Sequence, residues 1–146
     1  MSTAENPHAG HPREDHPAMI AARSSWRAVM ANDKAGWLDL MADDMVMEDP
    51  IGVAPTNPDG KGLQGKAAVS EFWDASMAKT DIHIVAHESF AAGLESAHRM
   101  TLTTSFENGM SMIVNGIFTY RVDDRGKLTN LRGYWALDEC EIRQPE

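Results

Sequence analysis

The segment MVMEDPIG, residues 45–52, ends an apolar strand pattern with an acidic side chain. Alternate residues of a β-strand share a face, so Asp49 is predicted to continue the face of Met45 and Met47. Glu48 is predicted to point to the opposite face. A carboxylate on an apolar face is desolvated, which raises its pKa and suits it to act as a general base. The residues leave a second interpretation open, in which Asp49 caps the following turn and faces solvent.

The elements that must position this carboxylate begin with three predicted helices. Over residues 17–30, apolar side chains recur at spacings of three and four, the period of an amphipathic helix. Shorter helices are predicted over residues 34–41 and 66–79. The acidic segment 42–44 is expected to be a turn, and residues 50–65, dense in Pro and Gly, are expected to form a loop.

The second half of the chain has the composition of β-strands. Glycine-containing polar segments separate its β-branched runs and favour hairpin turns. Strands are predicted within residues 81–93, 96–106, 110–122 and 128–139. Helices followed by hairpin-connected strands predict an α+β fold, with three N-terminal helices on one face of a curved, mostly antiparallel sheet. Such a layer forms a cone that encloses a pocket.

Length and composition set the organisation of the chain. The 146 residues are enough for one domain with a real core. Residues 1–16 are rich in Pro, Gly, His and charge, so they are predicted to form a flexible tail before a domain at 17–146. The tail histidines His8, His11 and His16 are expected to be solvated rather than to bind a metal.

Charge and cysteine content exclude several classes of protein. The net charge of −9 argues against nucleic acid or an anionic membrane as partner. A single cysteine, Cys140, allows no internal disulfide and no zinc site. No stretch approaches the roughly 18 apolar residues of a membrane span. The N-terminus lacks the pattern of a signal peptide, and a cytoplasmic protein is therefore expected.

The chain contains the segment LMADDMVMEDPIG, then a loop rich in Pro and Gly, then GKAAVSEFW and a late GYW. Together these segments resemble the ketosteroid isomerases, or steroid Δ-isomerases, of the nuclear transport factor and SnoaL-like superfamily. The resemblance runs from Pro17 to Glu139. It implies the cone-shaped fold, a homodimer, no cofactor and a deep apolar pocket for a flat steroid. It also places Asp49 on the general base of the family.

The implied chemistry moves a steroid double bond from the 5-ene to the 4-ene position through a dienolate. Preorganised hydrogen-bond donors must stabilise the dienolate oxygen. This family is a standard example, with an Asp base and an oxyanion hole made of a tyrosine and a protonated aspartate. In this chain the tyrosine position falls on Ser25 and the aspartate position on Phe118. Ser25 can donate a hydrogen bond, whereas Phe118 cannot.

Other side chains are candidates to replace the missing donors. They are the Tyr120 hydroxyl and the indole N–H of Trp26 or Trp135, although each of these aromatic residues is also suited to a place in the core. Methionine packs adaptably around irregular ligands. The pocket is predicted to include Met45, Met47, Phe72, Met112 and Phe118.

Three functions are compatible with this pattern. The first is a steroid Δ-isomerase with Asp49 as base, and the alternative is a non-catalytic binding protein for steroids or similar lipids. A third is different pocket chemistry, such as polyketide cyclisation or epoxide hydrolysis. The epoxide hydrolases of the superfamily use an Asp-Arg-Asp arrangement that has no convincing equivalent here. Fold alone does not decide among these functions.

Overall fold

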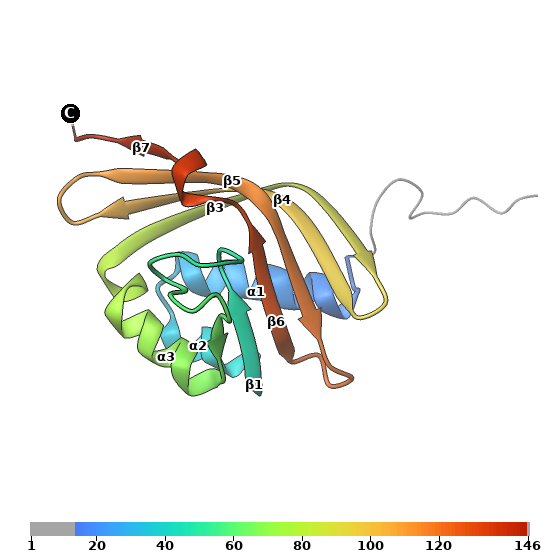
Figure 1. Ribbon diagram of the computed structural model, residues 1–146. Helices are drawn as coiled ribbons and strands as arrows, with labels where there is room; N and C mark the ends of the chain where they lie inside the picture. The colour runs from blue at the N-terminus through green and yellow to red at the C-terminus, as the bar shows by residue number, and fades with distance from the viewer. Residues whose placement is uncertain (1–13, 146) are drawn as a thin grey trace, which may run out of the picture.

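The computed structural model describes residues 14–145, in which three helices pack beneath a strongly bent sheet (Figure 1). The helices are α1 (Pro17–Met30), α2 (Lys34–Asp39) and α3 (Lys66–Ala75), with short 3-10 turns η1 (Met77–Lys79) and η2 (Leu137–Glu139). The strands are β1 (Met41–Glu48), β2 (Leu63–Gln64), β3 (Thr80–Ala92), β4 (Glu95–Phe106), β5 (Ser111–Val122), β6 (Leu128–Tyr134) and β7 (Glu141–Arg143).

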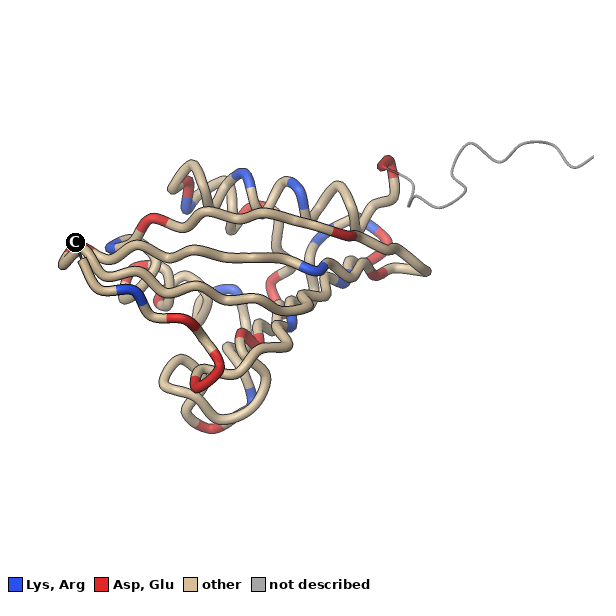
Figure 2. The backbone as a smooth tube through the Cα atoms, turned by 90° about the horizontal axis from the view of Figure 1, so that it is seen from above, with Lys and Arg blue, Asp and Glu red and all other residues tan. Residues whose placement is uncertain are grey.

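The sheet has the order β2-β1-β6-β5-β4-β3, with β7 paired to the beginning of β5. All of its pairings are antiparallel except that of β1 with β6. The long central strands carry few charged residues along most of their length (Figure 2). The predicted α+β cone with a curved, mostly antiparallel sheet is confirmed.

Helix α1 begins at Pro17, as predicted, but its N-cap residue His16 belongs to the segment that was predicted to be a tail. The His16 side chain caps it, because Nδ1 accepts a hydrogen bond from the Ala18 backbone N–H at 3.1 Å. The other ring nitrogen of His16 bonds to the Gly93 carbonyl oxygen at 2.9 Å, in the β3–β4 turn. His16 is therefore part of the folded domain and not of the tail. The rest of the predicted tail up to residue 13, with His8 and His11, lies outside the described residues.

Several boundaries differ from the prediction. The helix predicted over 66–79 ends at Ala75 and is followed by η1, and the loop predicted over 50–65 contains the short strand β2. At two further boundaries, long-range pairing overrides local pattern. The acidic segment 42–44, expected to be a turn, belongs to β1, and α2 ends at Asp39. The Leu128 N–H donates to the Leu40 carbonyl at 2.8 Å, so β6 draws the chain into the sheet at this point. At the other end, the strand predicted to reach residue 139 stops at Tyr134. The chain then passes through η2 into β7, which was not predicted.

The inward faces of the strands form cross-strand rows along the concave side of the sheet. Phe118 of β5 lies opposite His98 of β4, and Met112 lies opposite Thr104. Helix α1 contacts β3, β4 and β5 from the concave side. The bend keeps the sheet from closing fully onto the helices, and a cavity remains between them.

Candidate functional site

A cavity of about 250 Å³ lies between the concave face of the sheet and helices α1 and α3. Its wall is mainly apolar and aromatic, as in most small-molecule sites. Asp49 is the only acidic or basic side chain on this wall among the described residues. The one carboxylate of the cavity therefore faces a low-dielectric space.

Asp49 directly follows β1 and occupies the predicted face. It lines the cavity together with Met47, whereas Glu48 points away and pairs with Arg132 at 2.6 Å. The Ile51 N–H donates to the Gly133 carbonyl at 3.0 Å and fixes the chain after Asp49 to β6. Strand alternation thus turns the carboxylate into the cavity and Glu48 out of it.

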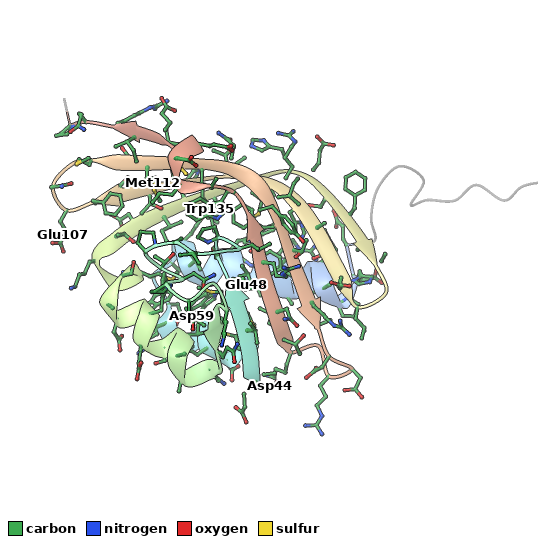
Figure 3. All side chains as sticks on the ribbon, in the orientation of Figure 1. Asp44, Glu48, Asp59, Glu107, Met112 and Trp135 are labelled. Atoms are coloured by element: carbon green, nitrogen blue, oxygen red, sulfur yellow. The ribbon has the colours of Figure 1, made fainter. Side chains whose placement is uncertain are left out.

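The Asp49 carboxylate has one strong partner. The Trp135 indole N–H donates to Asp49 Oδ1 at 2.5 Å, and Figure 3 places Trp135 under the bent sheet. Burial raises the pKa of the Asp49 carboxyl, and the Trp135 hydrogen bond lowers it in part. The carboxylate is enclosed by protein and touches open space only on its cavity side, which explains why desolvation dominates.

A glycine makes this contact sterically possible. A Cβ atom on Gly133 would lie 2.5 Å from Asp49 Oδ1 and 2.9 Å from Trp135 Nε1. It would also lie 3.1 Å from Cε1 of Phe118, which walls the same space. Any side chain at position 133 would push the carboxylate and the indole apart.

Tyr120 presents a hydroxyl to the same cavity. Its side chain is buried, and its oxygen accepts a hydrogen bond from the Trp26 indole N–H at 2.9 Å. Burial raises the pKa of the Tyr120 hydroxyl above its usual range, the Trp26 bond opposes this, and the Asp49 charge adds to it. The hydroxyl therefore stays protonated and keeps its own hydrogen to donate.

Ser25 has a matching arrangement on α1. It is only 2% exposed, lines the cavity and accepts a hydrogen bond from the Trp37 indole N–H at 3.0 Å. Among the candidate donors, Tyr120 and Ser25 thus retain a free hydroxyl hydrogen. The indole N–H groups of Trp26 and Trp135 are already donated to Tyr120 and Asp49.

The predicted pocket residues fall into two groups. Met47, Phe72, Met112 and Phe118 line the cavity. The expectation for Met45 is corrected, because this side chain lies in the core and is absent from the cavity wall. Its carbonyl accepts from the Gly65 N–H at 2.7 Å, next to the start of α3, and its side chain belongs to the main core cluster.

Further wall residues escaped the sequence interpretation. They come from the inward phase of β3, β4, β5 and β6, and include Ile82, Ile84, Met100, Leu102, Val114 and Leu131. Their alternation in β4 was visible in the sequence. Which inward residues would meet open space rather than a helix depends on the bend of the sheet, and this was not visible.

His98 lies behind the cavity and is buried. Ser96 donates its hydrogen to the Ala18 carbonyl at 3.1 Å, so it accepts one from His98 Nε2 at 2.7 Å. Nδ1 lies 2.7 Å from the Ser89 hydroxyl and accepts its hydrogen when the ring is neutral. Burial, with the nearby charge of Arg23, lowers the pKa of His98 to about 4.

The His98 ring supports the aromatic residues at the cavity. It meets Trp26 edge-to-face with ring centroids 4.8 Å apart, and Tyr120 with centroids 5.5 Å apart. Such edge-to-face contacts fix ring orientation. His98 thereby helps to orient the indole that donates to Tyr120.

The described residues contain neither a candidate metal cluster nor a helix that could span a membrane. Within residues 14–145 no group of three or more His, Cys, Asp or Glu side chains is placed to hold a metal ion. None of the helices in this part of the chain has the length and apolar character needed to cross a membrane.

Comparison with known proteins identifies relatives over most of the chain. A family model described as a SnoaL-like domain matches residues 22–131. A Δ5-3-ketosteroid isomerase from Mycobacterium sp. is 46% identical in its solved structure, with a TM-score of 0.85 over 88% of this chain and 99% of that chain. A Mycobacterium tuberculosis protein, solved in complex with estradiol-17β-hemisuccinate, is 48% identical with a TM-score of 0.84, over 87% and 99% of the two chains.

A further relative is also a steroid isomerase by name. A steroid Δ-isomerase from Nocardioides simplex is 27% identical over 110 residues, which are 75% of this chain and 81% of that protein. An epoxide hydrolase of M. tuberculosis shares only 17% identity at a TM-score of 0.72, which shows the fold alone.

Proposed function

Because the chain belongs to the ketosteroid isomerase-like branch of the SnoaL-like domain family, we propose that it is a steroid Δ-isomerase with Asp49 as its general base. One observation carries the proposal. The Asp49 carboxylate and the Tyr120 hydroxyl face the same apolar cavity, and each accepts a hydrogen bond from an indole. A carboxylate without a protein cation beside it suits proton transfer better than it suits simple binding.

In the proposed reaction, ionised Asp49 removes a proton from the carbon between the 3-ketone and the 5,6-double bond. The electron pair of that C–H bond moves through the ring to the ketone oxygen and gives a dienolate. Protonated Asp49 then returns the same proton to the far end of the conjugated system. The product is the 4-ene-3-ketone, and no atom is gained or lost.

The Tyr120 hydroxyl is the proposed donor to the dienolate oxygen. Because Trp26 donates to the Tyr120 oxygen, it polarises the Tyr120 O–H bond and strengthens its donation. Ser25, held by Trp37, is the second candidate donor. These two hydroxyls replace the tyrosine and the protonated aspartate that the family resemblance led us to expect at positions 25 and 118.

The opposing influences on Asp49 suit a proton shuttle. Burial favours the protonated form, which must exist between the two steps, while the Trp135 hydrogen bond favours the ionised form that starts the reaction. A base poised in this way gives up the proton as readily as it takes it.

The relatives support a steroid as the ligand. Two of those compared are named steroid isomerases, and a third is solved with a steroid ester bound. The test is to mix the purified protein with 5-androstene-3,17-dione and follow the absorbance of the conjugated enone. We expect catalysed conversion. Steroid binding without conversion would favour the non-catalytic alternative.

The homodimer implied by the resemblance remains a prediction. The outer face of the sheet offers exposed apolar side chains for it, including Val85, Ile117 and Tyr134 at 40%, 41% and 50% exposure. Ile117 and Tyr134 are cross-strand neighbours on that face. Light scattering at micromolar concentration should give twice the chain mass, and a monomer mass would contradict the prediction.

A further inference from the structure

The inward row of β5 has a gap at Gly116. Alternate residues of this strand face the concave side of the sheet, and those that line the cavity are Met112, Val114, Phe118 and Tyr120. Gly116 has the same phase but no side chain. Its backbone does not require a glycine, because its φ lies outside the left-handed region. The reason for a glycine here must therefore lie in what occupies the space beside it.

The chain after β6 occupies that space. Strand β6 stays paired with β5 as far as Tyr134, opposite Ile117, and the chain then leaves for η2 and returns to β5 as β7 (Figure 1). A Cβ atom on Gly116 would lie 2.6 Å from the Tyr134 carbonyl oxygen and 3.2 Å from Trp135 Cβ. The carbonyl belongs to the backbone, so it cannot rotate away as a side chain can. A residue larger than glycine would displace the chain at 134–135.

The Trp135 side chain thus lies against glycines of two adjacent strands. Its Cβ lies beside Gly116 of β5, and its Nε1 lies 2.9 Å from where a Cβ atom on Gly133 of β6 would be. Gly133 pairs with Phe118, so Gly116 is its diagonal neighbour on the same face. From this position the indole N–H reaches Asp49 Oδ1 at 2.5 Å.

We propose that Gly116 is a positioning residue for the isomerisation and acts through Trp135. By leaving room for residues 134–135 on the inward side of β5, it sets the place from which the indole N–H meets the Asp49 carboxylate. Gly133 makes room for the contact itself, whereas Gly116 is absent from the cavity wall and acts from the neighbouring strand. The inference rests on the proposed function, because it names a residue for that reaction.

A methyl group at position 116 should weaken the Asp49–Trp135 hydrogen bond. It would come closer to the Tyr134 carbonyl oxygen than real Cβ atoms do, so the chain that carries the indole must shift. Complete loss of a hydrogen bond to a charged group changes a pKa by roughly 1–2. Because the Trp135 bond lowers the pKa of Asp49, Gly116→Ala should raise that pKa by part of this amount.

Few other groups can confuse this readout. Among residues 14–145, Asp49 and Tyr120 are the only titratable side chains that line the cavity. Burial raises the pKa of the Tyr120 hydroxyl, which therefore stays protonated. Glu48 pairs with Arg132 on the opposite face, and His98, behind the cavity, is the same in every variant compared.

The experiment follows the Trp135 indole N–H in ¹H–¹⁵N NMR spectra. The four tryptophans give four indole signals, and Trp135→Phe identifies the signal of Trp135. In Gly116→Ala this signal should move, and its titration with pH should report a higher pKa for Asp49. The acid limb of kcat/KM for 5-androstene-3,17-dione should move to higher pH by the same amount. Asn115→Gln is the control, because it adds one carbon at the neighbouring exposed position, and it should change neither readout.

A double variant tests whether Gly116 acts through the indole. Adding Gly116→Ala to Trp135→Phe should move the acid limb no further than Trp135→Phe alone. A further shift would overturn the inference, and so would a Gly116→Ala protein whose Trp135 signal and acid limb match those of wild type. Failure of Gly116→Ala to fold would also overturn it, because the glycine would then serve the fold and not the reaction.

The proposed function fails by a different result. Conversion of 5-androstene-3,17-dione with an unchanged indole titration in Gly116→Ala would overturn the role of Gly116 alone. A shifted titration in a protein that converts no steroid would overturn the isomerase, while Gly116 would still position Trp135 against Asp49.

Discussion

At the inner end of the cavity, Asp49, Tyr120 and Ser25 each accept a hydrogen bond from an indole N–H. At the outer end, towards η1 and the β4–β5 hairpin, the cavity is lined by Ser76, Thr104 and Phe106 instead. The inner groups are fixed before a ligand arrives, as catalysis requires of groups that stabilise developing charge.

The inner and outer ends of the cavity also differ in how far their side chains are buried. Ser25 and Tyr120 are 2% and 3% exposed, whereas Phe106 at the outer end is 40% exposed. His98, with Ser89 and Ser96, adds a further layer of hydrogen bonds behind the inner end. The two ends of the cavity therefore differ: the polar groups at the inner end are buried and hydrogen-bonded, whereas the outer end is open to solvent. This difference also ranks the substitutions that should matter.

The largest effect is expected at Asp49. Asp49→Asn removes the base but keeps the shape, so turnover should fall by about 10³-fold, within the range for loss of a general base. Steroid binding should persist. Glu48→Gln is the control, because this side chain faces away and can still meet Arg132. Steady-state assays with equal turnover in the Asp49 variant and wild type would remove the assignment.

Tyr120→Phe should come next. Loss of one oxyanion donor typically lowers turnover by about 10²–10³-fold, or roughly 2.7–4 kcal/mol. Trp26→Phe acts only through the Tyr120 oxygen and should therefore have a smaller effect. Rates of the two single variants and the double variant would show this, because the double variant should resemble Tyr120→Phe. Additive losses would indicate that Trp26 acts independently.

Trp135→Phe should change the pH dependence more than the maximal rate. The Trp135 hydrogen bond lowers the pKa of Asp49, so its loss should raise that pKa further. The acid limb of the kcat/KM profile should then move to higher pH, with activity recovered in alkaline buffer. A limb that stays in place would mean that the indole does not act on the base.

The smallest effect concerns stability behind the inner end. His98 has a folded pKa of about 4 against 6.5 unperturbed, so unfolding takes up a proton between these values. The stability contributed by the neutral ring is present above about pH 6.5 and is lost as pH falls towards 4, by at most about 1.4 kcal/mol per pH unit.

Denaturant unfolding across this pH range checks the effect. His98→Gln, which lacks the titrating ring, should show a shallower loss of stability than wild type between pH 6.5 and 4. Identical slopes in the two proteins would assign the acid sensitivity to carboxylates instead.

The sequence predicted the parts of this site that depend on local pattern. Alternation along 45–49 placed Met47 and Asp49 on one face, and the inward phase of β5 placed Phe118 and Tyr120 together. The partners of these groups were not predictable. Trp135 and Trp26 reach Asp49 and Tyr120 across separations of 86 and 94 residues. Which indole meets which oxygen depends on the bend of the sheet and not on spacing.

The fold shows the same limit. Hairpin turns and helix periods could be predicted from the sequence, because they are set within a few residues. The start of β1 and the existence of β7 were not, because each is decided by a partner strand distant in sequence. Met45 and Met47 illustrate the point. Both were placed on one face, but Met45 is buried in the core while Met47 lines the cavity, and this difference depends on how the elements pack.

Gly133 explains why the late GYW motif pairs a glycine with a tryptophan, and the explanation can be applied to related chains. No atom larger than hydrogen fits where the carboxylate and the indole meet. The contact therefore requires both the glycine and the tryptophan two positions later. We expect relatives that use an indole-bound aspartate to vary together at these two sites. A relative with alanine at the glycine position should have lost the tryptophan, moved the aspartate, or abandoned the chemistry. The motif can therefore sort relatives by mechanism before any of them is assayed.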